Sequence, residues 1–74
     1  MEKLQSTDLS ILLKTLPPVI ARKDLNVYLG GLISSGYMAN LDSKGLGPKS
    51  VKSGRRVAYI REDLVAWLER WLSS

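Results

Sequence analysis

The chain has 74 residues, of which 45% are hydrophobic and 24% are charged, and it contains neither cysteine nor histidine. A chain this short forms one small domain with little room for a deep catalytic pocket. The absence of cysteine excludes disulfides and thiolate metal sites, and the absence of histidine removes the commonest general base and transition-metal ligand. We therefore expect a single domain over residues 1–74 that is not an enzyme and holds no metal or cofactor.

The hydropathy pattern argues against export and membrane insertion. The chain begins Met-Glu-Lys without an apolar run, and no segment approaches the ~20 apolar residues of a membrane span. We expect a cytoplasmic protein with no membrane partner.

The first predicted element is an extra N-terminal helix within residues 8–16, preceded by a frayed segment at 1–7. Its apolar positions share one helical face, and three residues that can cap a helix come just before them. Pro17-Pro18 ends this helix, because a residue before proline is pushed out of the α region. Val19-Ile20 is short and apolar, and we expect it to pack onto the core as an extended strap.

The next two predicted helices are short and joined by a glycine-containing turn. The first begins at Arg22, turns Leu25, Tyr28 and Leu29 inward, and ends at Gly30-Gly31. The second is capped by Ser34 or Ser35 and runs to about Ser43, with Tyr37, Met38 and Leu41 inward. Two such helices in succession are typical of a helix-turn-helix.

The outward face of the helix ending near Ser43 is small and polar, which suits a major groove about 12 Å wide. Gly36 lies on that face although glycine costs about 1 kcal/mol against alanine in a helix. A close approach to another surface would explain it. Two interpretations of Asn40 remain open: its side chain makes two hydrogen bonds to an adenine, or it is an ordinary surface residue.

Positive charge is concentrated between Lys44 and Arg61, which holds six basic residues and no acid, while the rest of the chain sums to −2. Residues 50–52 and 56–60 are predicted to be extended, and Ser53-Gly54 between them supplies the reversal. The pattern predicts a two-stranded antiparallel ribbon with a basic tip.

The last predicted helix begins near Arg61 or Glu62. Glu62 and Asp63 occupy its first turn, where the helix dipole favours acids. Its apolar residues form an i, i+3, i+4, i+7 stripe, and with Tyr59 they are expected in the core: Leu64, Trp67, Leu68 and Trp71. In sum, we expect an α+β, mostly helical fold, a winged helix-turn-helix with a two-stranded wing and a C-terminal helix.

The run GPKSVKSGRRVAYIREDLVAWLE resembles the Gly-Pro, ribbon and "GRRV.Y..EDL..WL" pattern of the AlpA and excisionase-like branch of the MerR superfamily. The preceding YLGGLISSGYMANLDSKGLGP also resembles the helix-turn-helix half of prophage-associated members. Two features depart from the family pattern. Ala21 stands where a capping Ser or Thr is frequent, and Ser34, Ser35 and Gly36 stand where many relatives carry Arg or Lys.

This resemblance implies a small bacterial or phage-encoded, nucleoid-associated DNA-binding protein of a prophage or mobile element, acting as a transcriptional regulator or an excisionase-like factor. Its DNA-binding recognition helix would present Ser34, Ser35, Ala39, Asn40, Ser43 and Lys44. Its wing and phosphate contacts would be Lys49, Lys52, Ser53, Gly54, Arg55 and Arg56. Arg22 and Lys23 are additional phosphate candidates.

We expect double-stranded DNA as the partner, with integrase or RNA polymerase as open alternatives for a protein partner. About five phosphate contacts predict a log–log salt slope near −4 to −5. A protein-interaction module that uses the same fold on an acidic partner is the alternative function. The oligomeric state also stays open between a monomer and a weak dimer that binds DNA cooperatively, and the helix before Pro17 is the candidate dimer contact.

Overall fold

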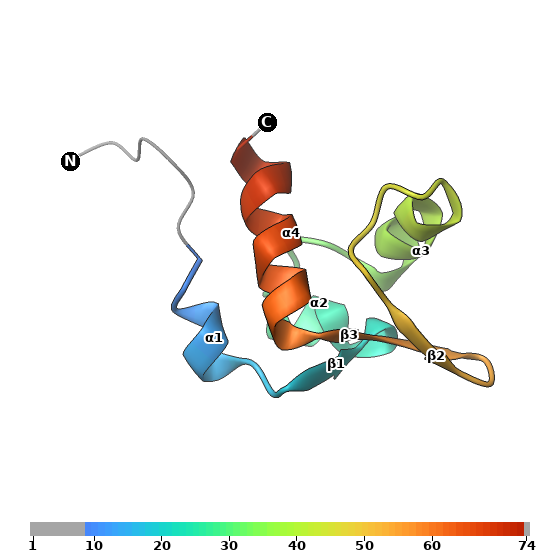
Figure 1. Cartoon of the computed structure of the whole chain (residues 1–74), viewed down its shortest axis with the longest axis horizontal. Coiled ribbons are helices and arrows are strands. Elements are labelled where there is room, and N and C mark those ends of the chain that lie inside the picture. Colours follow the sequence, from blue (N-terminus) through green and yellow to red (C-terminus); the bar gives the residue numbers. More distant parts are fainter. Residues whose placement is uncertain (1–8, 74) are drawn as a thin grey trace.

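The computed structural model describes residues 9–73, which form a small α+β domain with a three-stranded antiparallel sheet and a C-terminal helix (Figure 1). The elements in chain order are α1 (Leu12–Thr15), β1 (Val19–Ala21), the 3₁₀ helix η1 (Arg22–Asp24), α2 (Leu25–Tyr28), α3 (Ser35–Ser43), β2 (Val51–Ser53), β3 (Arg56–Ile60) and α4 (Arg61–Ser73). The α+β class is confirmed at this level.

Within this described range, no helix combines the length and apolarity that crossing a bilayer requires.

Among the described residues, helix α4 supplies four of the ten buried core residues, more than any other element, and its apolar stripe faces the core as predicted. Leu64 and Leu68 are fully buried, and Trp67 is 6% exposed. Trp71 extends the stripe by stacking on Trp67, with ring centroids 5.5 Å apart and planes 13° from parallel. Burying a side chain of this size stabilises the folded state by about 1.5–3 kcal/mol. Packing against α4 therefore makes a large contribution to the stability of the domain.

The sheet has three strands in the order β1-β3-β2: the predicted antiparallel ribbon is present as β2 and β3, and a third strand that was not predicted, β1, adds to it. The apolar strap after Pro17-Pro18 is itself a strand, and it pairs antiparallel with β3. Ile20 lies opposite Tyr59 in this pairing, and both side chains are fully buried. A bond from the Arg61 amide to the Pro18 carbonyl, 2.8 Å long, continues the pairing past the strand end.

The β2–β3 hairpin extends away from the body of the domain, below α3 in the view of Figure 1. Ser53 pairs with Arg56, so the two-residue turn is Gly54-Arg55, one position later than predicted. Gly54 has φ = +64°, a value that glycine adopts without strain at the first central residue of a hairpin turn. Strand β2 starts at Val51 instead of Ser50.

Helix α1 is a single turn and much shorter than the helix predicted over 8–16. Its N-cap residue, Ile11, offers no capping side chain, and Leu16 at the other end is already extended before Pro17. The segment is anchored instead by the Leu9 amide, which donates to Glu69 Oε2 on α4 at 2.8 Å. The predicted frayed segment at 1–7 and the first residue of the predicted helix lie outside the described residues.

The helix predicted from Arg22 divides into η1 and one turn of α2. Ala21 is the N-cap and makes no side-chain cap bond, as its methyl group requires. Leu25 is fully buried, but Tyr28 is 44% exposed, so its predicted inward position is wrong. The helix ends at Tyr28, and Leu29 in the following turn packs against the core instead.

Candidate nucleic-acid interface

Helix α3 is capped as predicted but contributes little to the core. The Ser34 hydroxyl accepts a hydrogen bond from the Tyr37 amide at 3.1 Å, the geometry of a serine N-cap. Met38 is the one fully buried side chain among residues 35–43. Tyr37 is 44% exposed and touches the edge of the core through Trp71, with ring centroids 6.0 Å apart, so its predicted inward position is wrong.

Polar contacts at Asp42 hold α3 against two other elements. Asp42 Oδ2 accepts a hydrogen bond from Arg22 Nη1 of η1 at 3.0 Å and another from the Tyr59 hydroxyl of β3 at 2.5 Å. Burial, together with this bond, raises the pKa of Tyr59 well above its usual range, so the hydroxyl stays a donor at neutral pH. We call Asp42, Arg22 and Tyr59 the Asp42 clasp.

The loop after α3 is built around the same carboxylate. A Cβ on Gly47 would clash with Asp42 Oδ1, and because Arg22 and Tyr59 hold that carboxylate in place, glycine is favoured there. Trp67 Nε1 of α4 donates to the Leu46 carbonyl at 2.9 Å, and Pro48 is buried. These contacts fix the path from α3 to β2 and so fix where the hairpin begins.

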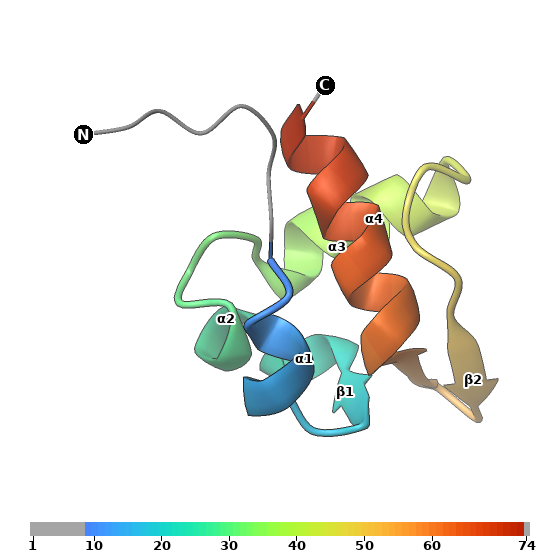
Figure 2. The same ribbon diagram turned by 60° about the vertical axis from the view of Figure 1, so that its left-hand side comes forward.

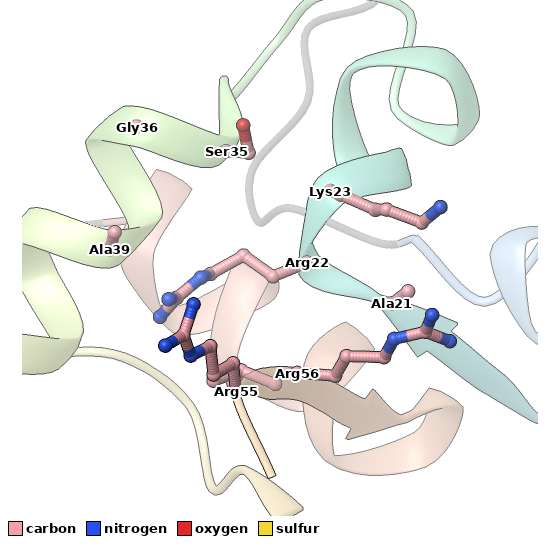
Figure 3. A pocket seen from close by; sticks show the side chains of 9 residues that line it. Ala21, Arg22, Lys23, Ser35, Gly36, Ala39, Arg55 and Arg56 are labelled. Atoms are coloured by element: carbon pink, nitrogen blue, oxygen red, sulfur yellow. The ribbon is translucent and has the colours of Figure 1, made fainter. Parts of the chain in front are cut away.

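Two hollows lie between α3 and the hairpin. The first has a volume of about 400 Å³ and brings together side chains of η1, α3 and the hairpin (Figure 3); its lining is Ala21, Arg22, Lys23, Ser35, Gly36, Ala39, Arg55, Arg56 and Val57. The second measures about 380 Å³ and is lined by Arg22, Ala39, Asp42, Ser43, Ser50, Lys52 and Val57. The two hollows are adjacent, because they share Arg22, Ala39 and Val57, and together we call them the α3–hairpin groove.

Eight of the fourteen predicted DNA-binding residues line this groove: Arg22, Lys23, Ser35, Ala39, Ser43, Lys52, Arg55 and Arg56. Ser35, Ala39 and Ser43 follow one another at intervals of four, so one face of α3 forms a wall. Six others are exposed but line neither hollow: Ser34, Asn40, Lys44, Lys49, Ser53 and Gly54.

Two basic residues have structural partners that the sequence did not reveal. Arg22, expected to face outward as a phosphate candidate, is paired with Asp42 and keeps 27% side-chain exposure. Arg61 donates to the Leu16 carbonyl at 3.3 Å and pairs with Glu62 at 2.9 Å. Of the six basic residues in the cationic stretch, Arg61 therefore belongs to the scaffold, and five are exposed: Lys44, Lys49, Lys52, Arg55 and Arg56.

Sequence reasoning missed Asp42 altogether. One signal for it was present, since Asp42 is the single acidic residue between positions 25 and 61. A lone acid amid basic neighbours is a candidate for a specific ion pair, although its partners could not be named without the fold.

The first hollow can hold an anion, because four basic side chains line it, no acidic side chain does, and its other lining residues are small or apolar. In Figure 3, the guanidinium groups of Arg22 and Arg55 point to one side of the first hollow, and the side chains of Lys23 and Arg56 extend to the other. Among the described residues, no group of three acids offers a metal-binding cluster.

Comparisons of the chain with protein-family models, with curated proteins and with solved structures gave no match.

Proposed function

We propose that this chain is a winged helix-turn-helix protein that binds double-stranded DNA, with α2 and α3 as the helix-turn-helix and the β2–β3 hairpin as the wing. In a cell it would act as a transcriptional regulator or an excisionase-like factor of a prophage or mobile element. Duplex DNA is the polyanion that fits a basic hairpin beside a small-faced helix.

The observation that carries the proposal is the convergence at the first hollow of the α3–hairpin groove. Lys23 of η1 and Arg55 and Arg56 at the hairpin tip come from segments more than thirty residues apart, yet they line the same hollow as Ser35 and Ala39 of α3. Positive charges on both sides of an open hollow favour an anion beside them. A duplex backbone supplies that anion.

The exposed residues of α3 are divided between phosphate and base contacts in this proposal. Lys44, at the end of the helix, reaches phosphates as a point charge on a flexible stem. Asn40 is exposed and is the base-reading candidate. The Ser43 hydroxyl already donates to the Asn40 carbonyl at 2.8 Å, so it contacts DNA as an acceptor.

Fluorescence anisotropy with a labelled random duplex across a salt series tests the proposal. We expect log affinity to fall against log salt with a slope near −4 to −5, from about five neutralised phosphates. The double variant Arg55→Glu with Arg56→Glu should lose at least about a hundredfold in affinity at low salt, because two phosphate attractions become repulsions.

The matched control is Lys14→Glu with Arg70→Glu, which changes the net charge by the same amount. Both control residues are exposed and lie on α1 and α4, outside the groove. Equal losses of DNA affinity in the two double variants would mean that affinity depends on net charge alone and not on the hairpin residues. DNA binding that survives the hairpin reversal would rule out the hairpin as the wing.

The alternative, a protein-interaction module acting on an acidic partner, is favoured by a different surface. Val27, Tyr28 and Leu32 are 78%, 44% and 52% exposed around the end of α2, and exposed apolar residues gathered in sequence suit a protein contact. Under this alternative the random duplex would bind with a shallow salt slope, and the variant Val27→Ser with Leu32→Ser would abolish partner binding.

A further inference from the structure

Gly36 is a glycine that the fold itself does not require. It lies in the first turn of α3, and its φ is not positive. A Cβ built on it would meet no heavy atom within 4 Å. Alanine in its place would be the better helix former, so neither backbone strain nor internal packing accounts for the missing side chain.

Gly36 differs in this respect from the other glycines of the chain. Gly47 is favoured by the position of Asp42, and the remaining four take positive φ. The space that a Gly36 side chain would occupy borders the first hollow of the α3–hairpin groove, where Ala39 follows on the same wall. The two smallest side chains of α3 therefore lie beside the hollow that Lys23, Arg55 and Arg56 surround.

We infer that this hollow binds one sugar–phosphate unit of the DNA backbone, and that the small side chains at positions 36 and 39 leave the space it occupies. The inference rests on the proposed function and deepens it, because it assigns a defined subsite to the duplex. The phosphate lies beside Lys23 and Arg56, whose side chains extend to the same side of the hollow (Figure 3), and the deoxyribose lies on the methyl groups of Ala21 and Ala39 and on Val57.

The size and chemistry of the hollow favour this occupant over a lone phosphate ion. Its ~400 Å³ falls within the roughly 300–1,000 Å³ typical of ligand pockets, which leaves room for a sugar beside the phosphate. Carbon atoms form much of its floor, and a deoxyribose offers carbon–hydrogen surface that can lie on them. The Asp42 clasp keeps Arg22 at the boundary between the two hollows.

Two substitutions that keep every charge test the inference. Gly36→Ala should raise the melting temperature by a few degrees through its better helix propensity, yet weaken DNA binding by about threefold to tenfold because its methyl group enters the occupied space. Ala39→Leu fills more of the hollow and should weaken binding by about tenfold or more. The salt slope should change little in both variants, because the basic side chains remain.

Ala66→Leu is the matched control for Ala39→Leu, since Ala66 is exposed on α4 and lines neither hollow. Opposite directions of melting temperature and affinity in Gly36→Ala would support the inference, since a purely structural role moves both together. Wild-type affinity in Gly36→Ala and Ala39→Leu, with binding still lost on reversal of Arg55 and Arg56, would overturn the inference and leave the proposed function intact. If the unmodified chain shows no salt-dependent binding to the duplex, both fail.

Discussion

Helices α3 and α4 are held in the fold by different forces. Along α4, Leu64, Val65, Trp67 and Leu68 are all buried, and the helix is fixed by apolar area removed from water. Along α3, Met38 alone is buried. The position of α3 depends on Met38, on Leu41 at the edge of the core and on the Asp42 clasp.

Under the proposed function, this difference would leave one side of α3 available to DNA. In that proposal, α3 faces the core on one side and DNA on the other, and small side chains on the outer side would let the DNA approach closely. Directional bonds from Asp42 to η1 and β3 add to the few apolar contacts of α3, and the Ser34 cap stabilises the start of the helix itself. The stability of α4 and the exposure of α3 should therefore respond to different substitutions.

The largest expected effect is on the α4 side. Leu68→Ala leaves a cavity where a fully buried side chain stood, and we expect a loss of about 2–5 kcal/mol in the free energy of unfolding. That is a large share of the ~5–15 kcal/mol of a typical domain. Urea unfolding followed by tryptophan fluorescence measures it. Leu72→Ala, at a position 37% exposed on the same helix, should cost less than half as much, and equal losses would contradict the described packing.

The second effect breaks the clasp that fixes α3. Asp42→Ala leaves Arg22 and the Tyr59 hydroxyl without their shared acceptor, and we expect a loss of about 1–3 kcal/mol. Backbone amide shifts should change in η1, α3 and the loop that follows it, and little in the C-terminal half of α4. Asn40→Ala, an exposed position on the same helix, serves as the control and should stay within about 0.5 kcal/mol. Shifts spread evenly over the domain would argue against a local clasp.

A smaller effect is expected at the start of α3. Ser34→Ala removes the acceptor of the Tyr37 amide and should cost about 1 kcal/mol. Hydrogen exchange at the Tyr37 amide should become faster, because the amide is no longer protected. Ser43→Ala is the comparison, since that hydroxyl donates to a carbonyl and caps no amide. Unchanged exchange at Tyr37 in Ser34→Ala would mean that the cap is not formed in solution.

An effect of similar size at neutral pH, with an additional dependence on pH, concerns Tyr59. Its pKa is raised in the folded state, first by burial and then by the bond to Asp42, above the ordinary value of 10.0. The contribution of this raised pKa to the free energy of unfolding is fully present below pH 10. It is lost as the pH rises above 10, because the unfolded chain then releases the tyrosine proton more readily than the folded chain does.

Tyr59→Phe should therefore cost only about 1 kcal/mol at neutral pH and should flatten the fall in melting temperature above pH 10. Thermal unfolding monitored by circular dichroism between pH 8 and pH 11 measures both quantities. Tyr28→Phe, at an exposed position, is the control and should keep the wild-type profile. An equally steep fall in Tyr59→Phe would show that other groups govern the alkaline transition.

Local patterns were sufficient for elements whose geometry depends on a few neighbouring residues. The stripe of α4, the serine cap of α3 and the positive φ of Gly54 were all predicted, because helical spacing, a capping hydroxyl and a glycine turn act over a few positions. Partners distant in the chain were not. The pairing of Val19–Ala21 with β3 turned an expected strap into a strand, and Tyr28 and Tyr37 proved to be exposed.

The sequence by itself determined the small size of the domain, its α+β class, the α4 stripe and the cationic stretch, because these depend on composition and on short-range periodicity. Only the tertiary structure decided that Asp42 joins α3 to η1 and β3, that Arg22 and Arg61 are partly committed to the fold, and that Gly36 faces an open hollow. The physical reason is that a hydrogen bond or a cavity depends on atoms that meet in space, and residues 22, 42 and 59 meet only after the chain has folded.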